Sequence, residues 1–355
     1  MTKTKNPRVL MIGLTPPLEG GSQRHIYEIS SKIKNTEVLT QKGTICKNGI
    51  GVRLINKPVF LRNVLFSIWV RIYTLYLLLT LKKRYDAIHI HENLAYFCAI
   101  PLSWRYNVII TVHGIKGFKF YENKFLWFFF KQGLRAAKKI ICVDLVEKEM
   151  LEREGFRNVE HISNGVDINI YKEIKKKAEP KITFVGRIHR QKGVEYLMKA
   201  FDVIKDRYPK YKLEIVGKKE GELFEKLSKE FVDRRIIWKG FILDRKKLFS
   251  EIASSEILVF PSLWEALPWP ALLEGLASGR PVIASNLIGM NKIFESGKNI
   301  VLFEPGNVNQ LVDRLERLIR DEKLRKRIGA EGKKTASKYS WDTIAKKTNE
   351  VYNKL

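Results

Sequence analysis

Short apolar runs recur along the whole chain, and a helical pattern follows most of them. In the first half the runs are RVLMIGL (8–14), YDAIHIH (85–91), NVIITVHG (107–114), KKIICVD (138–144) and VEHISNG (159–165). In the second half they are KITFVGR (181–187), YKLEIVG (211–217), IIWKGF (236–241), ILVFPS (257–262), RPVIAS (280–285) and NIVLFEP (299–305). Most are continuous and rich in Val and Ile, as expected of parallel strands buried on both faces. The alternation predicts an α/β fold with two doubly wound parallel sheets of five or six strands.

The boundary between the two sheets is expected in residues 166–181, a charged stretch that contains Pro180 and precedes a new strand. We therefore predict a Rossmann-like N-terminal domain over 1–170 and a Rossmann-like C-terminal domain over 171–337. The last stretch, 338–355, has the pattern of one more amphipathic helix. Ligands of such sheets bind beyond the carboxyl ends of the strands, so two facing sheets would form a cleft between them.

The charge of the chain is strongly basic and unevenly spread. The net charge is +27, and the first 140 residues carry +17 of it. Such a surface favours an anionic partner, which can be nucleic acid, an acidic membrane or a phosphorylated substrate. No nucleic-acid-reading module is recognisable, and the basic residues form no compact repeat. Nucleic-acid binding is therefore kept only as an alternative.

Three cysteines, Cys46, Cys98 and Cys142, lie far apart in the sequence. Their odd number and wide spacing fit neither a disulfide framework nor a zinc site, which suggests a reducing compartment. The N-terminal apolar run Val9–Leu14 is too short for a signal peptide. We expect a cytoplasmic protein.

Two segments of the first half are unusually apolar. Residues 64–81 hold 18 residues with one charge, Arg71, which would be costly at the centre of a bilayer. A buried or surface-docked helix is therefore favoured over a spanning one. Residues 114–139 interleave aromatic and basic residues. Together the two segments predict docking on the inner face of an anionic membrane, with an ordinary buried helix as the alternative. The residues proposed to contact the acceptor or membrane are His25, His91, Lys116, Lys119, Trp127, Lys131 and Arg135.

Several strand ends carry residues suited to ligand binding. Gly20 and Gly21 precede a helix near Ser22, and a glycine-rich turn at a helix N-terminus suits phosphate. The histidines His89, His91 and His113 follow or end neighbouring strands. They could hold a metal or line a polar cleft with hydrogen-bonding groups, and both interpretations stay open.

The loop after the first strand of the second half is GRIHRQKG, residues 186–193. Arg187 and Lys192 flank a turn that leads into a helix at Gly193. Two cations at a helix N-terminus can clamp a diphosphate. This predicts a phosphate site, the alternative being an exposed basic loop.

The stretch PSLWEALPWPALLEGLASGRPVIAS, residues 261–285, joins two predicted strands through a loop and a short helix. Pro270 suits the first position of that helix, and Gly279 ends it. Glu265 then lies on the loop and Glu274 one turn into the helix. Both can face the site lined by Arg187 and Lys192.

These motifs resemble the GT-B glycosyltransferases of family 4, which retain the anomeric configuration of the sugar. Nine segments match in order over nearly the whole chain: GGSQRHIYEIS, YDAIHIHE, TVHG, HISNGVD, FVGRIHRQKGVEYLMKAF, LEIVG, IIWKGF, the 261–285 stretch and YSWDTIAKKTNEVY. The resemblance implies transfer of a hexose or N-acetylhexosamine from a UDP- or GDP-sugar to an acceptor, and the basic, aromatic first domain suggests a lipid-linked one. It also implies that the last helix crosses back to the first domain.

The resemblance also implies roles for individual residues. Arg187 and Lys192 would hold the donor diphosphate, Glu274 the ribose hydroxyls and Glu265 the transferred sugar, with His113 beside it. The remaining donor-binding residues would act mainly through backbone groups; they are Gly20, Gly21, Gly186, Gly240, Phe241, Ala266, Leu267, Ala271 and Leu272.

Two departures from the family pattern concern this site. Eight residues separate Glu265 from Glu274, one more than the family has, so the position of Glu265 is open. The glycine-rich turn after LEIVG is replaced by KKEGE, residues 218–222. No Asp-x-Asp motif is present, and we expect neither a metal nor another cofactor. A GT-B epimerase or phosphorylase is the alternative activity.

Overall fold

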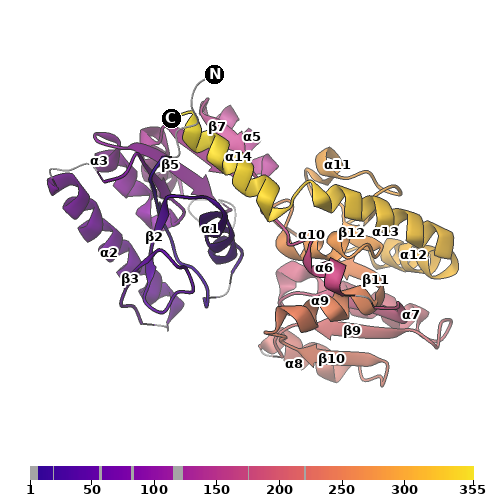
Figure 1. Cartoon of the computed structure of the whole chain (residues 1–355). Helices are drawn as coiled ribbons and strands as arrows, with labels where there is room; N and C mark the ends of the chain where they lie inside the picture. The colour runs from indigo at the N-terminus through magenta and orange to yellow at the C-terminus, as the bar shows by residue number, and fades with distance from the viewer. Residues whose placement is uncertain are drawn as a thin grey trace. The chain divides into compact units, whose positions relative to one another are not determined.

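The computed structural model describes residues 7–355 except 19, 56–57, 81–83, 115–122, 175 and 220, and except the side chain of Leu126. Lys116 and Lys119 therefore lie outside the described residues. The chain folds into two units (Figure 1). The first runs to Gly165 and also includes Trp341–Leu355, and the second is Val166–Ser340. The chain enters and leaves the second unit side by side, because the Val166 N–H donates to the Tyr339 carbonyl over 2.8 Å.

The sheet of the first unit has seven parallel strands in the order β3-β2-β1-β4-β5-β6-β7. They are β1 Val9–Ile12, β2 Thr36–Gln41, β3 Gly49–Val52, β4 Ala87–Ile90, β5 Asn107–Val112, β6 Lys139–Cys142 and β7 Val159–His161. The sequence pattern predicts five of these and misses β2 and β3, so the prediction of five or six strands was wrong here. The missed strands are TEVLTQ, in which four of six residues are polar, and GIGV, whose residues alternate between exposed and half-buried positions at the edge of the sheet.

The sheet of the second unit has six parallel strands, which agrees with the predicted number, and their order is β10-β9-β8-β11-β12-β13. They are β8 Glu179–Val185, β9 Lys212–Val216, β10 Ile236–Gly240, β11 Ser255–Phe260, β12 Val282–Ser285 and β13 Val301–Phe303. The strand order reverses between β8 and β11, and in the first sheet it reverses between β1 and β4. Such switch points are where open α/β sheets bind ligands.

Helices accompany both sheets (Figure 1). In the first unit they are α1 Gly21–Lys32, α2 Val59–Leu79, the 3-10 helix η1 Asn93–Cys98, α3 Ala99–Ser103, α4 Lys124–Ala136, α5 Leu145–Arg153 and α14 Trp341–Asn353. In the second unit they are α6 Ile170–Glu173, the 3-10 helix η2 Arg190–Lys192, α7 Val194–Ile204, α8 Glu222–Glu230, α9 Arg245–Ser254, α10 Pro270–Ala277, α11 Met290–Ile293, α12 Val308–Arg320 and α13 Glu322–Ser337. The helices α12 and α13 meet at Asp321, whose side chain caps α13 by accepting from the Leu324 N–H over 2.8 Å.

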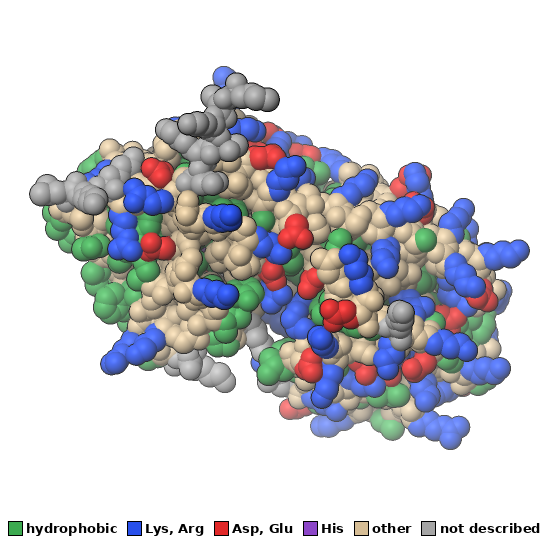
Figure 2. All heavy atoms as spheres, in the orientation of Figure 1, with side chains coloured by type: hydrophobic (Ala, Val, Ile, Leu, Met, Phe, Trp, Pro, Cys, Tyr) green, Lys and Arg blue, Asp and Glu red, His purple; other side chains and the backbone are tan. Residues whose placement is uncertain are grey.

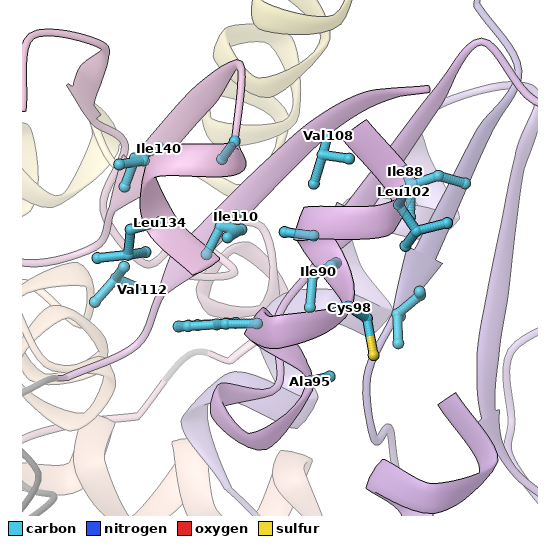
Figure 3. Close-up of a cluster of buried hydrophobic side chains, with 14 of the residues drawn as sticks. Ile88, Ile90, Ala95, Cys98, Leu102, Val108, Ile110, Val112, Leu134 and Ile140 are labelled. Carbon is cyan, nitrogen blue, oxygen red and sulfur yellow. The ribbon is translucent and has the colours of Figure 1, made fainter. Parts of the chain in front are cut away.

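The core of the first unit lies on both faces of its sheet, as the pleat requires. Leu10 and Ile12 of β1 belong to the cluster shared with α2, η1 and α3, whereas Val9 and Met11 belong to the one shared with α1 and α14. Figure 3 shows the first cluster, in which η1 and α3 lie over the side chains of β4 and β5. Both sheet faces are therefore covered, which explains the continuous apolar runs in the sequence.

The C-terminal helix α14 is part of the first unit. Trp341 at its start stacks edge-on against His25 of α1, with ring centroids 5.7 Å apart. Near its end, the Tyr352 hydroxyl lies 2.6 Å from Nδ1 of His89. A Cβ atom on Gly165 would lie 2.5 Å from the Trp341 ring, so the chain passes this ring only with glycine there. These contacts hold the last residues of the chain on the first sheet.

Candidate active site

The loops that follow β8 and β11 meet at the switch point of the second sheet, and they are bonded to each other. The Leu263 N–H donates to the Gln191 carbonyl over 2.8 Å, and Nε2 of Gln191 donates to the Trp264 carbonyl over 3.0 Å. Gly193 has a φ of +62°, and a Cβ atom on it would lie 2.0 Å from the Pro261 carbonyl oxygen. Only glycine fits this position, which fixes the residue next to Lys192 and the start of α7.

Lys192 and Glu265 form an ion pair between these two loops. Oε1 of Glu265 also accepts from the Ser262 hydroxyl over 3.0 Å, and its Oε2 accepts from Nε2 of Gln191 over 3.4 Å. The Glu265 side chain is only 8% exposed. The extra residue in the loop therefore does not carry Glu265 away from the site. Its contact with a transferred sugar stays a prediction.

Arg187 lies on the same loop as Lys192 and is exposed. Its guanidinium donates to Oε1 of Gln191 over 3.2 Å, so Gln191 links Arg187 to the Lys192–Glu265 pair. The second unit thus presents two cations beside the N-terminus of α7, where unpaired N–H groups and the helix dipole also favour an anion. This is the arrangement that the sequence predicts for a diphosphate.

Glu274 lies one turn into α10, as predicted, with Pro270 at the first helical position. Its Oε1 accepts from the guanidinium of Arg245 over 3.0 Å, while its Oε2 has no partner among the residues that the structure describes. The Arg245 guanidinium in turn lies over the ring of the fully buried Phe249, 4.7 Å from its centroid. One carboxylate oxygen is therefore held and the other can accept hydroxyl groups.

Sequence reasoning missed Arg245, although a signal exists. Arg245 opens α9 and is followed by two lysines, Lys246 and Lys247. Cations are unfavourable at a helix N-terminus, because the helix dipole is positive there. Their presence indicates that Arg245 has a role other than stabilising α9. Asp244 offsets the conflict by capping the helix, accepting from the Lys246 N–H over 2.8 Å.

The other predicted donor-binding residues of the second unit lie at strand ends, on the loop after β11 or at the start of α10. Gly186 and Gly240 follow β8 and end β10, and the Gly217 N–H between them donates to the Gly240 carbonyl over 3.1 Å. A Cβ atom on Gly217 would lie 2.2 Å from the Gly186 carbonyl, so these strand ends are closely packed. Phe241 is exposed. Ala266 and Ala271 are half-buried and Leu267 and Leu272 are buried, which leaves their backbone groups as the means of contact.

The first unit has a separate cluster of imidazoles at the carboxyl ends of β4 and β5. His91 and His113 directly follow these strands, and Nδ1 of His91 lies 3.0 Å from Nε2 of His113. The ring of His25 lies 5.0 Å from that of His113, centroid to centroid. The helix α1 follows the neighbouring strand β1. Gly20 is the N-cap of this helix, and Gly21 is its first residue. These residues line the switch point of the first sheet.

No group of three or more His, Cys, Asp or Glu side chains is placed to hold a metal ion within the described parts of the chain. The imidazoles bond to each other and to neutral groups instead. His25 Nδ1 lies 3.2 Å from Oδ1 of Asn164, and His89 Nε2 lies 2.6 Å from the Thr111 hydroxyl. Of the two interpretations of the histidines, the hydrogen-bonded one fits this geometry. Metal independence of the activity itself stays a prediction.

Burial corrects three of the proposed acceptor or membrane contacts. His25 and His91 are 1% and 2% exposed, and Trp127 is buried as well, because all three pack into the unit's interior. Lys131 pairs with Glu154 over 3.0 Å and lies beside the Trp127 ring. Arg135 is exposed, as the prediction requires.

Many exposed apolar residues of the first unit lie on two of its helices. On α2 they are Val59, Phe60, Leu61, Ile68, Trp69, Ile72, Leu75, Tyr76 and Leu79, and on α4 they are Phe125, Phe128 and Phe129. Phe97 of η1 connects the two helices, since its ring centroid lies 6.3 Å from that of Phe129. Hydrophobic side chains gather on the part of the first unit where α2 lies (Figure 2). We call these residues the apolar face.

The apolar face brings many exposed hydrophobic side chains together, and a contiguous exposed patch of this kind often marks an interaction site. Among the helices that the structure describes, α2 alone is long and apolar enough to cross a membrane, and 28% of its 18-residue window is buried. The sequence favours a buried or surface-docked helix here. α2 packs on η1 with one side and exposes the other.

The buried histidines predict a specific loss of stability in acid. Burial lowers the pKa of His25 from 6.5 to about 4 and that of His89 to about 3. The unfolded chain therefore takes up protons below about pH 6.5 that the folded chain refuses, and the free energy of unfolding falls as the pH drops. At pH 5 each histidine should cost about 2 kcal/mol relative to pH 7.

Urea unfolding at pH 7 and pH 5 measures this loss. The His89→Gln variant should lose about 2 kcal/mol less than the wild type between the two pH values. Equal losses in the wild type and in His89→Gln would contradict the assignment.

Family profiles match both halves of the chain. The profile described as "Glycosyl transferases group 1" matches residues 167–335, and the one described as "Glycosyltransferase Family 4" matches residues 19–170. Each lies mainly on one of the two units.

Similar proteins agree with these profiles. An uncharacterised glycosyltransferase of Methanocaldococcus jannaschii is 30% identical, covering 98% of each chain. The UDP-Gal:α-D-GlcNAc-diphosphoundecaprenol α-1,3-galactosyltransferase of Escherichia coli is 27% identical over 77% of this chain and 76% of its own. The structure of sucrose-phosphate synthase from Thermosynechococcus elongatus superposes with a TM-score of 0.80 at 19% identity, covering 98% of each chain, and shows the likeness of fold.

Proposed function

Because the chain belongs to the glycosyltransferases of family 4 and has their GT-B fold, we propose that it transfers a hexose or N-acetylhexosamine from a nucleotide diphosphate sugar to an acceptor, with retention of configuration. The observation that carries the proposal is the site at the β8–β11 switch point. There two cations, a helix N-terminus and two carboxylates gather on the two bonded loops and the first turns of α10. A nucleotide diphosphate sugar offers the matching groups: a dianion, ribose hydroxyls and a polar sugar.

Each part of the donor would be bound by a different set of residues on these loops and on α10. Arg187 and Lys192 bind the diphosphate, and the first-turn N–H groups of α7 and α10 add to them. Oε2 of Glu274 accepts from the ribose hydroxyls while Arg245 holds Oε1. When the donor binds, Lys192 pairs with the diphosphate in place of Glu265. The Glu265 carboxylate can then accept hydrogen bonds from sugar hydroxyls.

In the transfer, the bond between the anomeric carbon and the diphosphate oxygen breaks, and the oxygen keeps the electron pair. The acceptor hydroxyl forms the new bond to the anomeric carbon from the same face, and its proton passes to the departing phosphate. Lys192 and Arg187 stabilise the negative charge that develops there. These residues supply the stabilisation without a metal ion or another cofactor.

We propose a lipid-linked acceptor at the cytoplasmic face of a membrane. Three observations support it: the apolar face of the first unit, the net charge of +17 over the first 140 residues, and the similarity to a transferase whose name gives a diphosphoundecaprenol substrate. An amphipathic protein surface with nearby cations binds anionic bilayers. The protein would then bind its acceptor at the membrane surface, where the lipid carrier holds the acceptor.

A thermal-shift screen with UDP-, GDP- and ADP-sugars tests the donor. The matching nucleotide sugar should stabilise the folded protein by about 2.7 kcal/mol at a concentration of 100 times its dissociation constant. Glu274→Gln weakens the acceptor for ribose hydroxyls, so its stabilisation should be smaller at the same concentration.

The matched control is Glu230→Gln, which changes an exposed carboxylate on α8 and should respond as the wild type. If none of the nucleotide sugars stabilises the wild type, the transferase proposal is wrong. If one does so equally in Glu274→Gln, the ribose role of Glu274 is wrong.

A further inference from the structure

In the pair formed by His91 and His113, one buried nitrogen has no hydrogen-bond partner among the residues that the structure describes. Nδ1 of His91 lies 3.0 Å from Nε2 of His113, so these two atoms share one hydrogen bond. His91 is 2% exposed, and its other nitrogen, Nε2, is buried and bonds to no residue in the described part of the chain. His113 is partly exposed, and its Nδ1 is not one of the buried unpartnered atoms. The second nitrogen of His91 is therefore enclosed by the protein, whereas the second nitrogen of His113 is not.

The neighbouring groups cannot supply the missing partner. The rings that face the pair are those of His25 and His89, with the His89 centroid 4.1 Å from that of His91. His25 is bonded to Asn164, and both nitrogens of His89 are engaged by Tyr352 and Thr111. Within the described ranges, no carboxylate is hydrogen-bonded to His91 or His113. Burial lowers the pKa of His91 and of His113 well below 6.5, so both are neutral near pH 7.

Each neutral imidazole carries one proton, which leaves two arrangements. If His91 donates from Nδ1, then Nε2 of His113 is the acceptor and the proton of His113 is on Nδ1, at the surface of the unit. If His113 donates from Nε2, the proton of His91 must be on its buried Nε2 and has no acceptor. A buried N–H group without a partner is rarer in folded proteins than a buried acceptor without one. The first arrangement is therefore favoured.

We propose that His91 is a positioning residue that fixes the tautomer of His113, so that His113 presents an N–H donor at Nδ1 beyond the carboxyl end of β5. The placement of the proton stands on the geometry of the first unit alone. Its use rests on the proposed function, in which His113 lies beside the reacting sugar. His113 then acts as a neutral hydrogen-bond donor to a sugar oxygen, and Nδ1 cannot serve as a base.

Nitrogen-15 NMR of the ligand-free protein, labelled at histidine, tests the proton placement directly. The spectrum of His113→Gln identifies the His113 signals by their absence. At pH 7 the wild type should show a protonated Nδ1 and an unprotonated Nε2 for His113. A protonated Nε2 on His113 would overturn the proposal.

The variant His91→Phe tests the positioning role, since it keeps a planar ring and removes both nitrogens. The Nδ1–H form of His113 should no longer be held, and kcat/KM for transfer should fall about 10- to 100-fold, as for other residues that orient a functional imidazole. A His113 spectrum that stays as in the wild type would overturn that role. If this variant does not fold, the wild-type spectrum still decides the proton placement. A failed nucleotide-sugar screen would instead overturn the proposed function and leave the spectrum unaffected.

Discussion

Replacing Lys192 with Met should lower kcat/KM for sugar transfer about 10²- to 10³-fold, because the departing diphosphate loses a cation at the point where charge develops. Gly193, the residue after Lys192, packs closely against the Pro261 carbonyl. The ammonium group of Lys192 pairs with the carboxylate of Glu265. Its ammonium group is therefore held in place before the donor binds. Transfer of a radiolabelled or fluorescent sugar to membrane extracts measures the loss.

Two further variants separate this role from a structural one. Lys192→Met leaves Glu265 buried without its cation, which costs stability by itself. The double variant Lys192→Met with Glu265→Gln removes both charges, so its stability should recover. Its transfer should stay at least as slow as that of the single variant, because the Glu265→Gln change also weakens sugar binding. Recovery of activity in the double variant would contradict the diphosphate role. Lys199→Met, at an exposed position of α7, is the matched control and should transfer at the wild-type rate.

Replacing four residues of the apolar face with Ser should release the protein from anionic vesicles. The residues are Ile72 and Leu79 of α2 and Phe125 and Phe128 of α4, which are 52–73% exposed and so contribute little to the core. Burying roughly half of each side chain in a bilayer is worth about 1 kcal/mol per residue. Together the four changes should weaken vesicle binding about 10²- to 10³-fold.

Vesicle flotation at moderate salt measures this effect. The wild type should float with vesicles that contain anionic lipid, and less with neutral ones, because the basic residues of the first unit add to the attraction. The control replaces Val203, Val232 and Ile288, exposed residues of the second unit, and should float as the wild type. A wild type that does not float, but that sedimentation shows to be a dimer, would mean that a second copy covers the apolar face.

The sequence predicts the fold well where strands are buried on both faces. Such strands must be apolar throughout, so their runs are recognisable without any partner. The edge strand β3, GIGV, has half its residues exposed and two glycines, and its strand character comes from pairing with β2. The prediction fails there because the information lies in the neighbouring strand rather than in the run itself.

The candidate site is predictable to a similar extent. The loop sequences identify Arg187, Lys192 and Glu274, because glycine and proline mark the turns that place them. They leave Glu265 open, since whether a longer loop still brings its carboxylate to Lys192 depends on how the two loops bond. Arg245 is missed for the same reason: it comes from α9 and reaches Glu274 only in three dimensions.

Composition cannot tell which aromatic residues face outward. Residues 125–130 contain both the buried Trp127 and the exposed Phe125, because a helix turns successive residues to different sides. The predicted membrane contact at Trp127 is wrong for this reason. The neighbouring Phe125 and Phe128 occupy the side that the prediction needs.

The most direct test of the diphosphate site is calorimetric titration with a nucleoside, its monophosphate and its diphosphate, run in parallel for uridine and guanosine. In one of the two series the wild type should bind the diphosphate at least about tenfold more tightly than the monophosphate, a step of about 1.4 kcal/mol. In Lys192→Met that step should disappear while the weaker binding of the monophosphate remains. No binding in either series, or a diphosphate step that Lys192→Met leaves unchanged, would contradict the account.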